Sequence, residues 1–131
     1  MINVLPSIPP VILVAEYIRQ DPGGKLTILG LYISKKLVVP ETNKLPFVIP
    51  LSVCYAFIDG SGDFAVEITI TSPKGEIPVD TKGTIQKQRN QSMALIAQTL
   101  AFPVTEWGEY KIDVRLDGSS YLSSITIGPA K

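Results

Sequence analysis

Apolar and polar residues alternate along two stretches of the chain. In the first, residues 64–71, the even-numbered positions from Phe64 onward carry large apolar side chains. In the second, near the C-terminal end, charged residues alternate with Tyr110, Ile112, Val114 and Leu116. A repeat of two places successive side chains on opposite faces of a strand. Both stretches therefore predict strands that bury one face and expose the other.

Shorter apolar runs elsewhere are rich in β-branched and aromatic residues, and prolines and glycines separate them. Such runs indicate strands, and such separators indicate turns. Turns are expected at residues 21–24, 59–63 and 117–120. Further strands are expected at Val11–Gln20, Leu26–Ser34, Phe47–Ile58 and Tyr121–Ile127, with weaker ones at Ile77–Asp80 and Thr84–Gln88 and a short edge segment at Leu37–Val39. About seven to nine strands, spaced roughly 8–12 residues apart, predict an all-β sandwich or barrel.

The segment Ser92–Phe102 fits two interpretations. Helical spacing is matched by Met93, Ile96, Ala97 and Leu100. Strand alternation is matched by Ile96, Gln98, Leu100 and Phe102. We favour a strand, because Pro103 and Val104 continue the extended pattern and the rest of the chain is predicted to be β.

Two residues interrupt predicted strands. Gly30 lies in a run that is apolar at both odd and even positions. Either this run is buried on both faces, or Gly30 marks a bulge at which the faces switch. Pro50 lacks the N–H that a strand ladder uses, which predicts a bend or an edge position.

The composition indicates one globular domain. The chain has 131 residues, of which 45% are hydrophobic and 18% charged. A chain of this size and composition buries enough apolar surface to form its own core, which excludes disorder. We expect a single domain over residues 1–131, which begins with a proline-rich segment, residues 1–10.

The charge balance and the missing residue types exclude several functions. Twelve basic and twelve acidic residues give a formal net charge of zero, which argues against nucleic-acid or anionic-membrane binding by bulk electrostatics. The absence of histidine and the single cysteine, Cys54, exclude Ser-His-Asp and Cys-His catalysis, histidine-based zinc sites and an internal disulfide. Without a cationic neighbour in sequence, Cys54 is expected to be a small buried apolar residue. The basic residues Lys82, Lys87 and Arg89 are expected to lie on a solvated edge or loop.

The N-terminus predicts the location of the protein. It has no basic residue before its apolar stretch, and prolines interrupt it, which is unlike a secretory signal. The longest apolar run, Val11–Ala15, is far shorter than the roughly 20 residues that cross a bilayer. We therefore expect a cytoplasmic protein with no membrane contact.

The turn at residues 59–63 is a candidate cation site. Asp59 and Asp63 offer carboxylates and Ser61 a hydroxyl, all hard oxygen ligands of the kind that calcium takes. Calcium needs six to eight oxygens, so another loop would have to contribute. Asp and Gly also dominate ordinary hairpin loops. We expect a hairpin turn without a metal, and keep Asp59 and Asp63 only as weak binding candidates.

The stretch Trp107-Gly108-Glu109-Tyr110 is the second candidate. Trp107 and Tyr110 could stack on a sugar or a base. The same residues resemble the tyrosine corner of immunoglobulin-like sandwiches, in which a tyrosine at a strand start bonds back to the backbone. We favour the corner, and with it an immunoglobulin-like antiparallel sandwich. Glu106 and Glu109 flank this corner as a conceivable acid–base pair, but solvated carboxylates are far commoner.

The chain also resembles a bacterial and phage family of unknown function, DUF6941. The resemblance covers roughly residues 11–128 and is carried by turn and strand signatures. These are Val14–Ile18, Gly24–Tyr32, Phe64–Pro73 with Lys74-Gly75, Leu100–Pro103, and Trp107–Tyr110 through Asp117-Gly118. The resemblance implies a β-sandwich without a known activity or cofactor. The chain departs from the family pattern in a long polar segment, Val79–Ser92, where a proline-rich connection is expected.

These observations lead to a functional expectation. We expect a non-enzymatic interaction module that binds a protein partner, or a second copy of itself as a homodimer, through an edge strand or an apolar outer face. The apolar residues on both faces of the first two predicted strands motivate this, because one sheet of a sandwich buries only one face. The alternative is a small-ligand-binding protein, for example a phage protein that sequesters a host defence signal.

Overall fold

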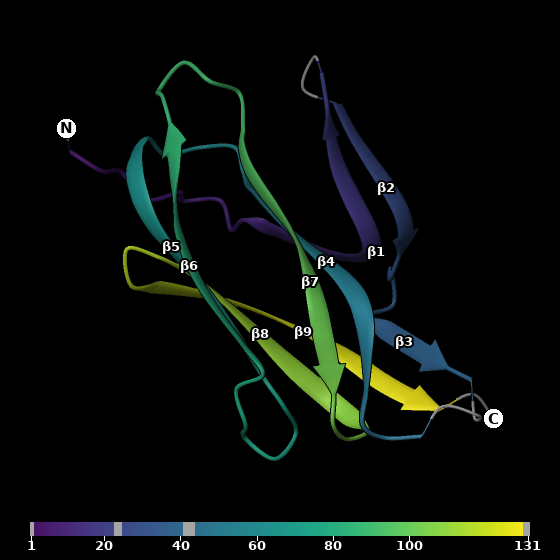
Figure 1. The fold of residues 1–131 in the computed structure, drawn as a ribbon. Coiled ribbons are helices and arrows are strands. Elements are labelled where there is room, and N and C mark those ends of the chain that lie inside the picture. Colours follow the sequence, from purple (N-terminus) through teal and green to yellow (C-terminus); the bar gives the residue numbers. More distant parts are fainter. Residues whose placement is uncertain (1, 23–24, 41–43, 130–131) are drawn as a thin grey trace.

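Two β-sheets packed face to face form the part of the chain that the computed structural model describes, residues 2–22, 25–40 and 44–129 (Figure 1). No helix occurs in these ranges, which confirms the all-β sandwich. The predicted turn at residues 21–24 includes Gly23 and Gly24, which lie outside the described residues. The described residues form nine strands, which are β1 (Val11–Asp21), β2 (Lys25–Leu31), β3 (Lys36–Val39), β4 (Phe47–Phe57), β5 (Gly62–Thr71), β6 (Val79–Lys87), β7 (Ala94–Val104), β8 (Gly108–Leu116) and β9 (Ser119–Pro129).

One sheet has four strands in the order β2-β1-β4-β7, and the other has five in the order β3-β9-β8-β5-β6. Neighbouring strands are antiparallel except β3 and β9, which are parallel. The expectation of a purely antiparallel sandwich is therefore wrong at this edge. The chain reaches β3 by crossing from the four-stranded sheet, and parallel pairing of strands so distant in sequence needs no hairpin turn.

The two alternating stretches form the centre of the five-stranded sheet, as predicted. β5 and β8 pair in a register that sets Val66 opposite Leu116 and Ile68 opposite Val114. These side chains are buried against residues of the other sheet such as Tyr55 and Phe102. Burying an aliphatic or aromatic side chain of this kind stabilises a fold by roughly 1.5–3 kcal/mol. The core between the sheets is therefore the main source of stability.

The ambiguous segment is a strand. β7 pairs with β4 along its full length, from Phe47 opposite Val104 to Phe57 opposite Ala94. The strand interpretation is confirmed and the helical alternative is wrong. The two weaker runs at Ile77–Asp80 and Thr84–Gln88 overlap one continuous strand, β6, which begins at Val79 and ends at Lys87. The middle residues of β6 are exposed, so the sequence does not indicate that the two runs are joined.

Pro50 lies where the sequence predicts it, at a local edge. In the order of the sheet, β4 is a central strand, but β1 pairs only with its residues Ser52–Ala56. Pro50 pairs with Ala101 of β7 on one side and lies beyond the end of the β1 ladder on the other. The missing N–H therefore costs no ladder hydrogen bond.

The β1–β2 hairpin changes faces halfway along its length. Val14 belongs to the core between the sheets, whereas Ala15 and Ile18 are buried together in a second apolar cluster. Ala15 and Ile18 would lie on opposite faces of a regular strand. Opposite this point, Gly30 has a φ of 64°, and β1 bends sharply in Figure 1. The face switch at Gly30 is confirmed, although the register is the same on both sides of it, so no residue is inserted.

The distal half of this hairpin covers part of the outer face of its own sheet. Ile18 packs with Leu26 and Ile28 in the second cluster, together with Cys54 of β4 and Leu95 of β7. Cys54 is buried, as predicted. The expectation that β2 is buried on both faces is wrong, because none of its residues is fully buried. The second half of β1 has β2 as its only ladder partner, which leaves β2 at the rim of the molecule.

Candidate functional site

The turn at residues 59–63 binds the N-terminal segment of the chain. The carboxylate of Asp59 accepts hydrogen bonds from the Ser7 amide at 2.8 Å, the Ser7 hydroxyl at 2.5 Å and the Ile8 amide at 3.3 Å. The Asn3 side chain donates to the Asp63 carbonyl at 2.7 Å and accepts from the Asp63 amide at 3.1 Å. The oxygens of Asp59 are therefore occupied by the protein's own backbone and hydroxyl groups.

No metal cluster is formed by the described residues. Within them, no three His, Cys, Asp or Glu side chains gather where they could share an ion. Asp59 and Asp63 sit at opposite ends of the turn, and the structure gives each a contact with the N-terminal segment. The arrangement fits attachment of that segment rather than cation binding.

Because Asp59 holds Ser7 and Ile8 as a carboxylate, we expect acid to weaken the attachment of the N-terminal segment at these two residues. The backbone hydrogen bonds between Val4 and Ser61 do not depend on this carboxylate. The hydrogen bond from the Ser7 hydroxyl is the main reason that the pKa of Asp59 lies below its ordinary value of 3.8. The Ser7 and Ile8 amides also lower this pKa, whereas desolvation raises it. A lowered pKa in the folded state stabilises the attached segment above a pH of about 4, and the effect is lost as the pH falls through the lowered value. As the pH falls below about 4, the NMR amide signals of Ser7 and Ile8 should therefore shift together.

Asp59→Asn supplies the control for this titration, because an amide does not ionise. In that variant the Ser7 and Ile8 signals should stay constant over the same pH range, while a core amide such as that of Ile112 reports the intact fold in both proteins. Identical acid titrations in the variant and the wild type would show that Asp59 does not hold the segment.

Tyr110 is part of the structure rather than of an open surface. Its side chain is 0% exposed, and its hydroxyl donates to the Glu106 carbonyl at 2.8 Å. The same hydroxyl accepts from the amides of Glu106 and Thr105 at 3.2 and 3.3 Å. Its ring packs edge-on against Phe102, with the ring centres 5.2 Å apart. These contacts form the predicted corner, and they leave Tyr110 no free face for stacking on a ligand.

The other residues of the corner are engaged as well. Trp107 is half-buried and packs against Phe47, with the ring centres 5.8 Å apart. The Glu106 carboxylate accepts from the Lys74 amide at 2.7 Å and lies 3.7 Å from the Lys74 ammonium. Glu109 is exposed. The corner therefore carries a structural ion pair and a packed aromatic pair.

Lys82 and Arg89 are exposed, as expected, but the expectation is wrong for Lys87. Its side chain is only 2% exposed, and its ammonium donates to the carbonyls of Gly60 at 3.0 Å and Gln88 at 3.4 Å. The long apolar stem lies inside the sandwich while the charged end satisfies backbone acceptors. Lys87 thus contacts the turn at residues 59–63 through the Gly60 carbonyl.

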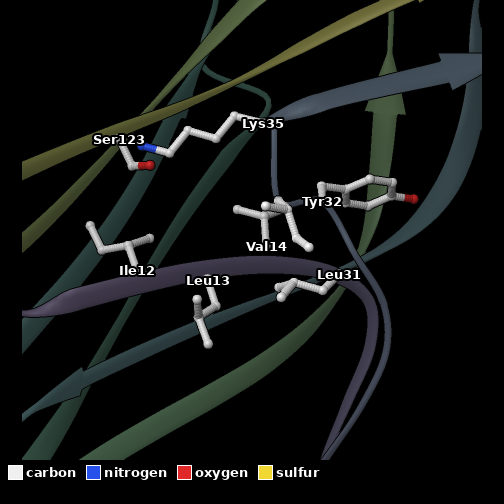
Figure 2. A pocket seen from close by; sticks show the side chains of 8 residues that line it. Ile12, Leu13, Val14, Leu31, Tyr32, Lys35 and Ser123 are labelled. Atoms are coloured by element: carbon white, nitrogen blue, oxygen red, sulfur yellow. The ribbon is translucent and has the colours of Figure 1, made fainter.

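A small pocket opens between the two sheets at the β1–β9 side (Figure 2). Its volume is about 180 Å³. The lining is mostly apolar, and its polar groups are Lys35, from the β2–β3 connection, and Ser123 of β9. The apolar lining residues are Ile12, Leu13, Val14, Leu31, Tyr32 and Ile33. Sequence reasoning missed this pocket, because Lys35 and Ser123 are far apart in the chain and belong to no motif.

The second candidate surface is the outer edge of β2. Of the four edge strands, β3 has only four residues, and β6 and β7 approach each other where the Thr81 hydroxyl donates to Gln98 at 3.1 Å. β2 has seven residues, and its only charged one is Lys25 at its first position. No described strand pairs with its outer side. Unpaired edges without charges or prolines readily accept another strand.

Exposed apolar side chains lie beside this edge. Tyr17 of β1 and Leu29 of β2 are cross-strand neighbours, and they are 42% and 55% exposed. Leu31 at the end of β2 and Ile33 in the β2–β3 connection are exposed as well. A free hydrogen-bonding edge and an apolar strip together are the ordinary parts of a strand-addition interface.

Comparison with known proteins places the chain in a family. None of the described residues belongs to a helix that is long and apolar enough to cross a membrane. No curated protein matches the chain. The sequence model of a family described as "Family of unknown function (DUF6941)" matches residues 10–127, which is nearly all of the 131 residues. The chain, with its sandwich of two sheets, therefore belongs to the DUF6941 family.

Proposed function

We propose that the protein is a non-enzymatic interaction module that associates through the outer edge of β2, and that its partner is a second copy of the chain. The open edge of β2, beside exposed Tyr17 and Leu29, is the observation that carries this proposal. The setting we propose is the cytoplasm of a bacterium or of a phage-infected cell.

A second copy suits this edge for physical reasons. Two antiparallel β2 strands related by a two-fold axis would join the four-stranded sheets into one continuous sheet. The single charge of β2, Lys25, lies at one end, so the two lysines would be at opposite ends of such a ladder. The formal net charge of zero removes long-range repulsion between copies.

We expect the dimer to dissociate when a charge is placed in the apolar strip. Light scattering coupled to size exclusion should give twice the chain mass of 14.2 kDa for the wild type and the single mass for Leu29→Lys. Leu29 is largely exposed, so the substitution should leave the monomer folded, and a buried lysine charge opposes strand addition.

Leu122→Lys is the matched control, because Leu122 is 76% exposed on β9 of the other sheet. This variant should keep the mass of the wild type. A wild-type mass of 14.2 kDa at concentrations of tens of micromolar, or loss of the dimer in both variants, would overturn the proposed edge.

The immunoglobulin-like arrangement is a further part of the proposal. The hydroxyl of Tyr110 bonds back to the backbone of Glu106 just before β8, as in the tyrosine corner of those sandwiches. The parallel β3–β9 pair is a departure from the simplest antiparallel version of that arrangement.

Binding of a small ligand is the second candidate function, and the pocket between the sheets is the observation that favours it. Its volume of about 180 Å³ is below the roughly 300–1,000 Å³ of pockets that enclose drug-sized ligands. A nucleotide-sized defence signal would therefore not fit into this pocket.

A further inference from the structure

We propose that the pocket between β1 and β9 binds a small carboxylate with a short apolar tail, held by the Lys35 ammonium and the Ser123 hydroxyl. The pocket lies within one chain, so this site goes beyond the proposed association through β2. Its argument rests on the lining of the pocket, on the backbone of Lys35 and on the hydroxyl of Ser123.

The backbone of Lys35 is held in a conformation that disfavours a side chain. Its φ is 58°, in the left-handed region where glycine is preferred. Two hydrogen bonds fix it there, because the Lys35 amide donates to the Tyr32 carbonyl at 3.1 Å and its carbonyl accepts from the Thr126 amide at 2.8 Å. A lysine at this position, where glycine would be less strained, indicates a use for its side chain.

That side chain is directed at the pocket. Figure 2 shows the Lys35 chain extending over the pocket toward Ser123. Among the described residues, Lys35 makes no ion pair, so its charge is available to a ligand. Because Lys35 is exposed, its chain can move outward by rotation about its own bonds to admit a ligand.

Ser123 provides the second polar group. Its hydroxyl oxygen is buried, and within the part of the chain that the structure describes it has no hydrogen-bond partner. A buried hydroxyl without a partner destabilises the protein until something bonds to it. A carboxylate oxygen lying between the ammonium and this hydroxyl would accept from both, which is the geometry of charge-assisted hydrogen bonds.

The remaining lining and the volume determine the polarity and the size of the ligand's tail. Ile12, Val14 and Leu31 provide an apolar wall, which suits an alkyl group rather than a second charge. A volume of about 180 Å³ holds roughly six non-hydrogen atoms at about 30 Å³ each. Butyrate has that size, and it is the probe with which we would test the site.

The test is an NMR titration of the isotopically labelled full chain with butyrate. We expect saturable shifts of the Tyr32, Lys35 and Ser123 amides with a dissociation constant of the order of 1 mM, in keeping with so small a ligand. Butyramide, which has the same shape without the charge, should bind at least about tenfold more weakly. Absence of saturable shifts at these residues, or equal binding of the amide, would overturn the proposal.

Two variants separate binding from folding. Lys35→Gly should remove butyrate binding while raising the melting temperature by a few degrees, because glycine adopts the observed φ without strain. Ser123→Ala should weaken binding several-fold and leave the fold intact. If Lys35→Gly binds butyrate with unchanged affinity, the lysine is not the ligand-binding group and the proposal fails.

Discussion

Cys54 is expected to react with a thiol reagent about a hundredfold more slowly in the folded protein than in the unfolded chain at a pH of about 8. Burial raises the pKa of its thiol from 9.0 to about 11. The thiolate is the reactive form, and a rise of about two pKa units lowers its population about a hundredfold below both pKa values. Alkylation rates measured by mass spectrometry, with and without denaturant, check this directly.

The same thiol reports on the β1–β2 hairpin. Cys54 lies on the outer face of the four-stranded sheet, where Ile18, Leu26 and Ile28 cover it. A charge at Ile18 would have to be buried against Cys54, so Ile18→Asp should separate the hairpin from the outer face of the sheet. The alkylation rate of Cys54 should then approach that of the unfolded chain.

Val11→Asp is the matched control for this variant, because Val11 is an exposed residue of the same strand. It should leave Cys54 as unreactive as in the wild type. If Ile18→Asp also leaves the rate unchanged while the protein stays folded, the hairpin does not protect this face, and the second apolar cluster is not what buries the thiol.

The sequence best predicts the strands in which each face lies in a single environment, either the core or the solvent. β5 and β8 lie between other strands, with one face on the core and one toward solvent, so their alternation is nearly complete. The sequence of β7 is ambiguous because many of its residues are only partly buried, which weakens the contrast between its two faces. Pairing with β4, a tertiary contact, decides its conformation.

The parts that the sequence does not predict depend on contacts between distant segments. The parallel pairing of β3 with β9 joins residues about ninety positions apart, and no local pattern encodes it. The same holds for Asp59, whose Asp-Gly turn gives no sign that Ser7 will bind it. Lys87 is predicted to be solvated from its charge alone, whereas its end reaches the Gly60 carbonyl.

Candidate sites are also predictable from the sequence only where their contacts are local. The corner at Tyr110 is predictable because its hydrogen bonds join residues four or five positions apart. The pocket between the sheets depends on Lys35 and Ser123, which only the β3–β9 pairing and the β2–β3 connection bring to one place. The edge of β2 is predicted as an apolar strand, but its free side follows from the strand order alone.

Two tyrosines of the core should respond differently to the loss of their hydroxyl groups. Tyr110→Phe is expected to lower the free energy of unfolding by about 1–3 kcal/mol. The hydroxyl donates to the Glu106 carbonyl and accepts from the Thr105 and Glu106 amides, and phenylalanine would leave these backbone groups without that partner. The ring itself keeps its packing against Phe102.

Tyr55→Phe should change the free energy of unfolding by less than about 0.5 kcal/mol or increase it. Tyr55 is fully buried, and within the described residues its hydroxyl has no hydrogen-bond partner. Burial also raises the pKa of this hydroxyl, in keeping with its apolar surroundings. Removing an unsatisfied buried hydroxyl loses no protein hydrogen bond and removes a desolvation cost.

Urea unfolding of both variants and the wild type measures the contrast, and equal slopes in the three curves show that the same surface is exposed in each. Because the two substitutions remove the same atom from equally buried rings, packing losses cancel in the comparison. A loss of the same size in both variants would mean that the Tyr110 hydroxyl is no more important than an unpaired one. The corner would then not stabilise the start of β8, and the strongest support for an immunoglobulin-like arrangement would be lost.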